Sequence, residues 1–469
     1  MSTPHPLERI GLHCHDARAL VVGLGKTGYS IARFLAAQGV AFAIADSRES
    51  PPLLAELRET LPDAAVFLGG FQSAAFTAAT HVIVSPGVPL DIPAIADADR
   101  RGLPVLGDLD LFALMVKAPV LAITGSNGKS TVTTLAGMMA EAAGRKTRVG
   151  GNLGTPMLDL LDASAELYVL ELSSFQLERS HFLEPVAATL LNISPDHMDR
   201  YPDLESYAAT KRRIFQGWGR MVLNRDDPVV AGMAEAGRDV VWFGVEEQPA
   251  EYALGRIDGD VEYQPAEYAL GRIDGEEWLL ARGEPLLKAS EVRIRGRHNL
   301  ANALAAVALC DAVDIPRQPM IEVLRRFGGL DHRMQRVAEI GGVVWVNDSK
   351  ATNVGACQAA LAGLEGKAVL LAGGDGKGAD FSVLRPVVAE KVRALVLMGR
   401  DAPLLEQVLH DLVPVTRVEN MAQAVQAARG LAQPGDTVLL TPACASLDQY
   451  KDYQERGRMF AEAVAMLRE

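Results

Sequence analysis

The sequence predicts an α/β protein of three domains: a Rossmann-like N-terminal domain, a central ATPase domain of the P-loop type and a Rossmann-like C-terminal domain. Its 469 residues leave room for about three domains of roughly 100–200 residues each. Short apolar runs typical of buried strands alternate with helix-like runs, which is the pattern of parallel sheets covered by helices. New segments begin at Asp108 and Leu330, so we expect domains at 1–107, 108–329 and 330–469.

Composition and charge limit the classes of function that the protein can have. Hydrophobic residues make up 49% and charged residues 22% of the chain, as is usual for globular proteins. The formal net charge of −13 argues against a nucleic-acid partner and means that an anionic substrate needs a local cluster of Lys and Arg. The four cysteines are scattered without metal-like spacing, which indicates reduced thiols in a cytosolic protein.

The sequence carries no signal for secretion or for a membrane. The first residues include Glu8, His13 and Asp16 and lack the basic-then-apolar pattern of a secretory signal. No run approaches the roughly 18 uninterrupted apolar residues of a membrane span. We therefore expect a cytoplasmic protein without membrane attachment. We also expect a monomer that acts on small molecules.

A phosphate-binding loop is predicted between an apolar run at 119–123 and a helix-like run at 131–143. Glycine lets the backbone approach a ligand, and the following helix points free N–H groups and the positive end of its dipole at an anion. Lys129 can reach the terminal phosphates, and Ser130 can hold a magnesium ion. Because Ile123 replaces the first glycine of the usual signature, the loop is a shortened variant. The predicted ATP-binding residues are Gly125, Ser126, Asn127, Gly128, Lys129, Ser130 and Thr131.

A second glycine-rich turn, at 23–28, joins a strand at 19–22 to a helix at 29–38. The next strand ends at Asp46, so the unit matches the dinucleotide-binding fingerprint G-x-G-x-x-G with an acidic residue about 20 positions on. By itself this unit indicates NAD. Any nucleoside diphosphate with a ribose would also suit it, or the glycines could serve helix–strand packing alone. The turn that contains Gly87 follows another strand, at the edge where open α/β sheets bind ligands.

Two strands of the central region also end in polar residues. The strand at 168–170 ends at Glu171, where an NTPase places a carboxylate directed at magnesium. The strand at 187–191 leads into a loop that holds His197 and two acids. Both loops are expected at the same edge of one sheet.

Two predicted helices carry further polar candidates. The helix at 207–215 contains the basic run Lys211-Arg212-Arg213, which could belong to the site or form a solvated face. Asn299 and Asn302 stand at the start of an alanine-rich helix that includes 300–309. They could contact a nucleotide, or Asn299 could be the helix N-cap.

The last third reads as another doubly wound domain. Helix-like runs separate four apolar strands, at 343–346, 369–371, 394–397 and 437–440. The loops after the first two strands carry Lys350 and Lys377. These lysines supply the positive charge that an anionic substrate needs.

The sequence QPAEYALGRIDG occurs twice, at 248–259 and at 264–275. Two copies are too few for a solenoid, and Asp-Gly is a turn signal of β-hairpins. We interpret the repeat as a tandem duplication within a surface hairpin that has no catalytic role.

With these motifs assembled, nearly the whole sequence resembles the Mur ligase family. The matching segments are ITGSNGKSTVTT, ELSSFQLE, NISPDHMDRYP, RGRHNLANALAA, NDSKATN, GGDGKGADF and TPACASLDQYKDY. The Asp-Asn-Pro-Arg signature of the diaminopimelate-adding members does not occur, and ASLDQ points to the D-glutamate-adding branch. The resemblance implies an ATP-dependent ligase that adds D-glutamate to UDP-N-acetylmuramoyl-L-alanine in peptidoglycan synthesis, and so serves the cell wall, cell shape and cell division.

The resemblance also implies a role for each matching residue. The UDP-substrate would contact Lys26, Thr27, Asp46, Ser47, Arg48, Gly87 and Asn152, and ATP would further contact Asn299, Asn302, Arg333, Asp348 and Lys350. D-Glutamate would contact Thr352, Lys377, Ser446, Leu447 and Tyr453, of which Tyr453 replaces a phenylalanine expected in this family. The catalytic residues would be Lys129, Glu171, His197 and Lys211, and two Mg²⁺ ions would be held by Ser130, Glu171, His197 and Lys211. Lys211 would carry a carbamate, which turns a cation into an anionic ligand.

The implied chemistry agrees with the residue types. A carboxylate is a poor electrophile, and transfer of the ATP γ-phosphate turns it into an acyl phosphate that an amine can attack. Such a step depends on positioning and charge neutralisation by Lys and Mg²⁺. Three domains around one cleft also suggest closure on binding, as a hypothesis that ligand-dependent X-ray scattering would test.

Three other interpretations stay open on the sequence. The first is an NAD-dependent oxidoreductase, which leaves the phosphate loop without a role. The second is a nucleotide-dependent switch that forms no bond, and the third is another ligase of the same fold, such as a folate polyglutamate ligase.

Overall fold

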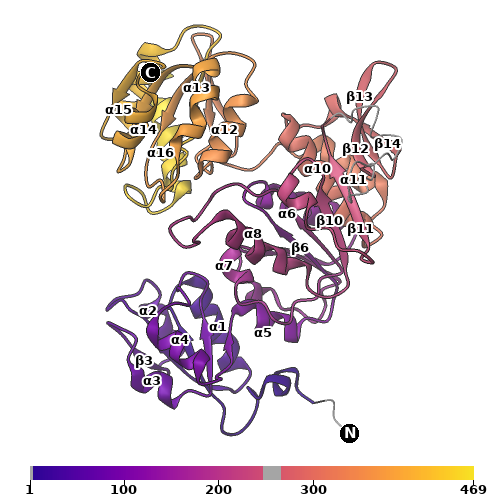
Figure 1. Cartoon of the computed structure of the whole chain (residues 1–469), viewed down its shortest axis with the longest axis vertical. Coiled ribbons are helices and arrows are strands. Elements are labelled where there is room, and N and C mark those ends of the chain that lie inside the picture. The colour runs from indigo at the N-terminus through magenta and orange to yellow at the C-terminus, as the bar shows by residue number, and fades with distance from the viewer. Residues whose placement is uncertain (1–3, 247–265, 469) are drawn as a thin grey trace.

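The structure, a computed structural model, describes residues 4–246 and 266–468. Three β-sheets with helices packed on them follow one another along the chain (Figure 1). They lie within residues 18–106, 120–288 and 335–440. The predicted three-domain α/β fold is therefore confirmed.

The first domain is a five-stranded, fully parallel sheet of order β3-β2-β1-β4-β5. Its order reverses beside β1, which is where open α/β sheets bind their ligands. The strands are β1 (Arg18–Val22), β2 (Ala41–Ala45), β3 (Ala65–Phe67), β4 (His81–Val84) and β5 (Val105–Leu106). The helices are α1 (Lys26–Ala37), α2 (Leu54–Thr60), α3 (Ser73–Ala78) and α4 (Pro93–Arg100), after a short 3-10 helix at Pro6–Ile10.

The central domain has nine strands in the order β14-β13-β12-β11-β10-β9-β6-β8-β7. The strands are β6 (Val120–Thr124), β7 (Thr147–Gly151), β8 (Leu167–Glu171), β9 (Ala187–Leu190), β10 (Arg220–Asn224), β11 (Val240–Gly244), β12 (Tyr268–Ile273), β13 (Glu276–Ala281) and β14 (Glu284–Lys288). The helices are α5 (Asp108–Met115), α6 (Lys129–Ala142), α7 (Ser174–Leu177), α8 (Leu204–Arg212), α9 (Pro228–Ala231), α10 (Arg297–Asp311) and α11 (Arg317–Arg326). Only the β12–β14 end of the sheet is antiparallel among the described strands.

The third domain has six strands in the order β15-β16-β20-β17-β18-β19, of which β15 is the antiparallel edge. The strands are β15 (Gln335–Ile340), β16 (Val343–Asn347), β17 (Ala368–Ala372), β18 (Val392–Leu397), β19 (Val415–Arg417) and β20 (Thr437–Leu440). The helices are α12 (Val354–Ala362), α13 (Arg385–Lys391), α14 (Ala402–Leu409), α15 (Met421–Leu431) and α16 (Tyr453–Ala465). All four strands predicted for this region are present.

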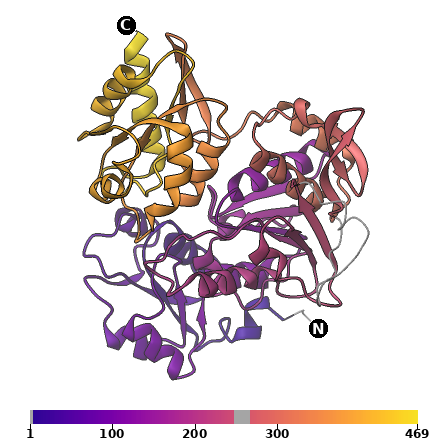
Figure 2. The same cartoon turned by 45° about the horizontal axis from the view of Figure 1, so that its top comes forward.

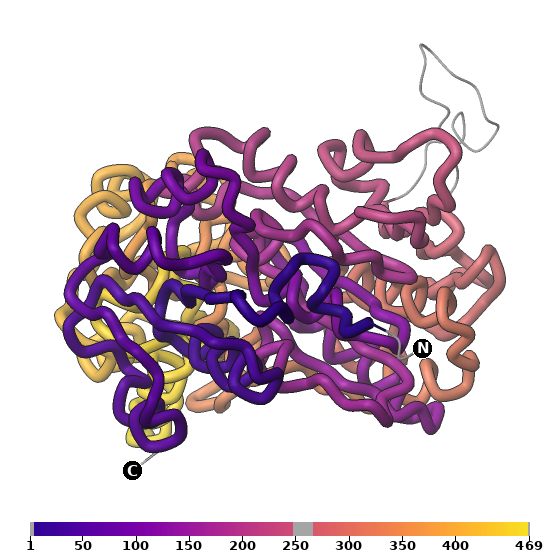
Figure 3. Tube along the Cα trace, turned by 90° about the horizontal axis from the view of Figure 1, so that it is seen from below, coloured from indigo at the N-terminus to yellow at the C-terminus, as the bar shows by residue number. Residues whose placement is uncertain are grey.

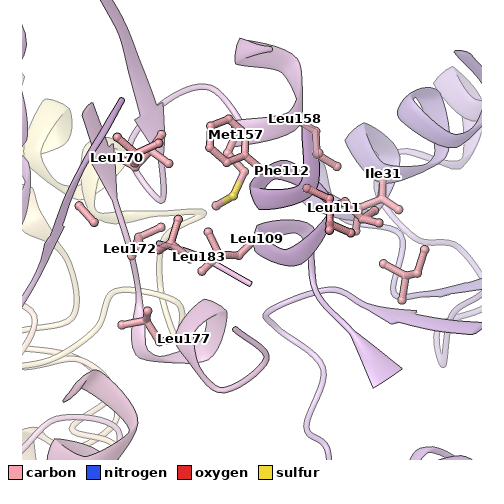
Figure 4. Packing of buried hydrophobic residues seen from close by; sticks show 14 of the residues in the cluster. Ile31, Leu109, Leu111, Phe112, Met157, Leu158, Leu170, Leu172, Leu177 and Leu183 are labelled. Carbon is pink, nitrogen blue, oxygen red and sulfur yellow. The ribbon is translucent and has the colours of Figure 1, made fainter. Parts of the chain in front are cut away.

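The cores explain why these segments fold as they do. All five residues of β6 are buried, because helices cover both faces of a parallel sheet. The alanine-rich α10 is buried from Ala303 to Cys310 and packs against α6, where small side chains let the two helices approach closely. A second cluster links the first two domains: Leu109, Leu111 and Phe112 of α5 lie between Ile31 of α1 and Leu170 of β8 (Figure 4).

The three domains surround one region. The first and third domains lie on the same side of the central domain, with the first at the bottom and the third at the top of the view in Figure 1. The rotated views keep this arrangement (Figures 2 and 3). The carboxyl-end loops of β6, β8 and β9 therefore face the third domain, as the contacts below show in detail.

Of the duplicated sequence, the structure describes the second copy from residue 266 on. That copy forms β12 and the Asp274-Gly275 turn into β13, so the predicted hairpin is confirmed for residues 266–275. The first copy, 248–259, lies outside the described residues.

Candidate active site

The phosphate loop follows a fully buried strand and ends at the first turn of α6. Gly128 is the helix N-cap and has a φ of +85°, which favours glycine. A Cβ there would lie 2.4 Å from Oδ1 of Asn302 on α10. The loop and α10 are therefore in direct contact, and the helix begins at Lys129, two residues earlier than the pattern predicted.

Lys129 is folded back onto its own loop. Its Nζ donates hydrogen bonds to the carbonyl oxygens of Gly125 (2.6 Å) and Ser126 (2.9 Å). Burial lowers the pKa of Lys129, although Glu171 and Asp196 oppose this shift. The amine thus lies at the mouth of the loop, where a phosphate would compete with the two carbonyl groups for its protons.

The loop after β9 is joined to the phosphate loop by hydrogen bonds. The Asn127 N–H donates to Asn192 Oδ1 at 2.8 Å, and Ser126 Oγ donates to the Ser194 carbonyl at 2.9 Å. These bonds hold the two loops together, and they already use the backbone N–H of Asn127. Asn192 and Ser194 were not among the predicted site residues.

Glu171 is a buried carboxylate with one free oxygen. Oε1 accepts a 2.6 Å hydrogen bond from Asn152 Nδ2, whereas Oε2 is buried without a hydrogen-bond partner. Burial raises its pKa, but Lys129, Ser130 and Asn152 outweigh burial and lower the pKa overall. An ionised carboxylate with an unpaired oxygen beside Ser130 is a suitable ligand for a divalent cation.

The described residues include no group of three or more His, Cys, Asp or Glu that could hold a metal ion. Magnesium binds one or two protein carboxylates together with water and substrate phosphates, so it does not need such a group. Glu171 and Ser130 fit this pattern. His197 offers a nitrogen instead of the oxygen ligand that magnesium prefers. Burial lowers its pKa to about 4 and leaves the imidazole neutral, so it would not repel a cation.

Lys211 points inward from α8. Its side chain is 1% exposed, and Nζ donates to the Gly125 carbonyl at 3.0 Å and to Thr124 Oγ1 at 3.3 Å. Burial lowers its pKa well below the usual value. The alternative of a solvated basic face is wrong for Lys211, whereas Arg212 is half-exposed and pairs with Glu235 at the surface.

The third domain reaches the phosphate loop through Arg333. One guanidinium nitrogen donates to Ser130 Oγ at 2.8 Å. Nearby, the Lys350 Nζ lies 4.1 Å from the centre of the Tyr453 ring, and burial lowers the pKa of Lys350 to about 8. Burial also raises the pKa of Asp348 to about 7. Positive charge from the third domain thus gathers at the loop.

Asn302 and Asn299 differ in their placement. Asn302 is buried against Gly128, whereas Asn299 is only half-buried and its Nδ2 donates to the Arg295 carbonyl at 2.8 Å. The N-cap of α10 is Gly296, so the N-cap alternative for Asn299 is wrong.

A second contact between the central and third domains is an ion pair. Lys377 Nζ lies 2.6 Å from Asp196 Oδ1, and Asn353 Nδ2 donates to Asp196 Oδ2 (3.2 Å) and to Asn127 Oδ1 (3.3 Å). Asp196 and Asn353 lie within two of the matching motifs, but neither was among the predicted site residues. Asp196 could have been predicted as a site residue from its place in the polar loop after β9.

The remaining D-glutamate candidates lie on loops of the third domain. Thr352 immediately precedes Asn353, and Ser446 is buried next to Leu447, which is 71% exposed. A bridge between Asp375 and Ala445 joins the loop of Lys377 to the loop of Ser446. The structure therefore brings these two loops together.

The first domain presents its glycine-rich turn as predicted. Oδ2 of the buried Asp46 accepts a bond from the Leu24 N–H at 2.7 Å, and Arg48 pairs with the same carboxylate. A Cβ on Gly28 would lie 1.8 Å from the Gly23 carbonyl oxygen, so this glycine permits close packing of α1 on the turn. Lys26 and Thr27 begin α1, and Ser47 lies in the loop between Asp46 and Arg48.

The turn that contains Gly87 is tied to the central domain. The carbonyl of the next residue, Val88, accepts hydrogen bonds from Arg179 and from Arg200. Arg200 stacks on Phe175, whose ring contacts His197 at a centroid distance of 4.7 Å. The first domain is thus connected to the loop that carries His197.

The fold and the site together define a class: a three-domain protein with a phosphate loop in its central domain, which basic side chains of the third domain contact or approach. Three family models match, namely the Mur ligase MurD-like N-terminal domain (residues 17–107), the Mur ligase middle domain (123–310) and the Mur ligase glutamate ligase domain (332–444). The chain belongs to the Mur ligase family. Membership in this family selects the ligase interpretation over the oxidoreductase and the switch.

Curated relatives are similar over nearly their full length. A UDP-N-acetylmuramoylalanine–D-glutamate ligase of Methylococcus capsulatus is 64% identical, covering 98% of this chain and 96% of that protein. Its counterpart in Nitrosococcus oceani is 53% identical, covering 96% of each chain.

Solved structures share the fold at low sequence identity. A pseudomurein peptide ligase type C from Methanothermus fervidus gives a TM-score of 0.63 at 17% identity, covering 96% of this chain and all of that one. The UDP-N-acetylmuramate–alanine ligase MurC of Thermotoga maritima gives 0.59 at 19%, covering 96% and 99%.

Proposed function

We propose that this protein is an ATP-dependent ligase that joins D-glutamate to UDP-N-acetylmuramoyl-L-alanine in peptidoglycan precursor synthesis. The observation that carries the proposal is the contact of the phosphate loop with the third domain, through Arg333 and Ser130. Together with the Lys377–Asp196 pair, it joins the proposed nucleotide site to a loop of the third domain that carries a lysine. The 64% identity to a ligase named for this reaction agrees with the proposal.

We assign the substrates to the three domains as the family resemblance suggests, with boundaries at 1–107, 108–329 and 330–469. The UDP moiety binds at the turn of Lys26 and Thr27, beside Asp46, Ser47, Arg48 and Gly87. ATP binds at the phosphate loop, Asn299, Asn302, Arg333, Asp348 and Lys350, and D-glutamate at Thr352, Lys377, Ser446, Leu447 and Tyr453. Asn152 has a second partner in Glu171, so it orients that carboxylate even when no substrate is bound.

The reaction has two steps. An oxygen of the substrate carboxylate attacks the γ-phosphorus, the bond to the β,γ-bridging oxygen breaks and ADP leaves. The amine nitrogen of D-glutamate then attacks the carbonyl carbon, phosphate leaves, and the nitrogen loses its proton to give the amide. Lys129 neutralises phosphate charge, and the loop N–H groups hold the phosphates in line.

Ser130, Glu171 and His197 would hold magnesium, which supplies further charge neutralisation at the phosphates when bound. Lys211 is suited to react with carbon dioxide, because only a neutral amine is nucleophilic and burial favours that form. The nitrogen lone pair forms a bond to carbon and a proton is released, which leaves an anionic carbamate. This carbamate would complete the ligand set for a second ion.

Phosphate release tests the function. The enzyme is incubated with ATP, Mg²⁺ and UDP-N-acetylmuramoyl-L-alanine, with D-glutamate, L-glutamate or no amino acid. We expect steady-state release only with D-glutamate. Release with a different amino acid would replace the assigned substrate, and release without any amino acid, retained in Lys129→Ala, would identify a contaminating phosphatase.

We also propose a monomer that acts in the cytoplasm. None of the helices in the described ranges is long and apolar enough to cross a membrane. Sedimentation of the purified protein at micromolar concentration tests the oligomeric state, and a mass of twice 50.2 kDa would contradict it.

A further inference from the structure

The Lys377–Asp196 ion pair lies where two loops from different domains meet. The two side chains are 15% and 10% exposed, so both charges have lost most of their water. Removing two charges from water is costly unless the pair has good geometry and further hydrogen bonds. Asp196 has these bonds: the His197 N–H donates to Oδ1 at 3.0 Å and Asn353 donates to Oδ2.

The pair is also close to the reaction centre. Asn353 bridges Asp196 to Asn127 of the phosphate loop, and Ser194, two residues before Asp196, bonds to Ser126. A Cβ on Gly355 would meet Ser194 Oγ at 2.9 Å, so the loops pack tightly. An amine held at Asp196 would therefore lie beside the phosphates that the loop holds.

We propose that Asp196 is the positioning residue that binds the α-ammonium group of the incoming amino acid, and that the Lys377–Asp196 pair fills the two ends of this zwitterion site until the amino acid arrives. This inference rests on the proposed function, which puts the amino acid at Lys377. A free α-amino acid carries one ammonium and one carboxylate on the same carbon. Lys377 complements the carboxylate and Asp196 complements the ammonium, so one ligand replaces both partners.

The exchange has a physical advantage. The two protein charges are already desolvated and held by other hydrogen bonds, so binding needs little reorganisation of the site. Hydrogen bonds between charged groups are stronger than neutral ones. A ligand that lacks either charge leaves one protein charge buried without its partner, which is unfavourable. The site therefore selects amino acids over dicarboxylates that lack an ammonium group.

Two ligands that differ only in the nitrogen test this inference. D-Glutamate carries the ammonium, and (R)-2-hydroxyglutarate replaces it by an uncharged hydroxyl while keeping both carboxylates. The KM for D-glutamate and the competitive inhibition constant for 2-hydroxyglutarate are measured in wild type and in Asp196→Asn, both full length. In the variant we expect the KM for D-glutamate to rise about tenfold or more, the usual effect of losing a charged hydrogen bond.

2-Hydroxyglutarate should move in the opposite direction. Asp196→Asn removes the anion that competes for Lys377, so its inhibition constant should stay the same or fall. Lys377→Met should weaken both ligands, because both present a carboxylate.

Equal weakening of both ligands by Asp196→Asn, or of neither, would overturn the inference. Asp196→Glu keeps the charge and serves as a second variant if Asp196→Asn unfolds; it should retain the preference for D-glutamate over 2-hydroxyglutarate, and loss of that preference would also count against the assignment. Failure of the proposed function is a separate result, since wild type would then release no phosphate with D-glutamate.

Discussion

Arg333 of the third domain donates a hydrogen bond to Ser130 of the phosphate loop over 2.8 Å. Ser130 is the first-turn hydroxyl assigned to magnesium, and 203 positions separate the two residues in the chain. The proposed nucleotide site is therefore shared between two domains. Any change in their relative position moves Arg333 with respect to the loop.

Arg333→Met should raise the KM for ATP about tenfold, because a hydrogen bond to a charged group contributes on the order of 1.5–3 kcal/mol. Initial rates over a range of ATP concentrations measure this effect. Arg336→Met is the matched control, since Arg336 is an exposed residue that pairs with Glu339 on the surface. An unchanged KM in Arg333→Met would remove this residue from the nucleotide site.

Gly128→Ala should lower the activity by more than the strain of a left-handed alanine backbone can explain. Gly128 and Gly144 have nearly equal φ values, +85° and +83°, but only at Gly128 would a Cβ meet another residue, Asn302. A left-handed alanine costs roughly 1–2 kcal/mol at either position. We expect Gly144→Ala to lower the melting temperature with activity kept, and Gly128→Ala to lose activity at least about tenfold as Asn302 is displaced. Equal activity in the two variants would contradict this argument.

Lys211→Ala should be inactive and should recover part of its activity with added acetate or another short carboxylate. The reason is that the proposed carbamate acts as an anion, which a free carboxylate can imitate in the space left by the side chain. Phosphate release at increasing acetate concentration measures the rescue. Arg212→Ala, one residue away on the surface, should be close to wild type. Full activity of Lys211→Ala without acetate would refute the role.

Asp108 should make the stability of the protein fall between about pH 4 and pH 6. Burial raises its pKa from 3.8 to about 6, so the folded state holds a proton that the unfolded state releases in this range. The contribution of Asp108 to stability is therefore largest below about pH 4 and is lost as the pH rises to about 6, a change of about 3 kcal/mol. Asp108→Asn should remove this slope in urea unfolding measured at several pH values. Asp63→Asn, on an exposed side chain, is the control, and parallel curves for wild type and Asp108→Asn would contradict the prediction.

Deletion of residues 248–263 should leave activity within about twofold of wild type. The shortened chain keeps one copy of the duplicated sequence and with it all of β12. That strand is held by Tyr268, which donates to Asp311 at 2.6 Å, and by Glu267, which accepts from the Trp242 N–H. Activity and melting temperature of the deletion variant measure the effect. Tyr268→Phe in the full chain serves as the comparison for stability, and it should lose about 1 kcal/mol. An inactive deletion variant would contradict the prediction and give the extra segment a function.

Local signals explain which features could be predicted. Strand, glycine turn and Lys-Ser pair are adjacent in the chain, so the phosphate loop could be predicted without knowing the fold. The position of Glu171 followed from the same rule, since parallel strands end at one sheet edge. The N-cap of α10 was harder to predict, because both Gly and Asn are acceptable at this position. The backbone conformation shows that Gly296 is the N-cap.

The sequence by itself determined the α/β class, the order of the three domains, the phosphate loop and, through its motifs, the family. These features depend on apolar periodicity and on residues close together in the chain. Only the tertiary structure decided that Lys211 points inward while Arg212 stays at the surface, that Arg333 reaches Ser130, and that Lys377 pairs with Asp196. Those relationships depend on burial and on distances between separate domains, which packing sets and no local pattern encodes.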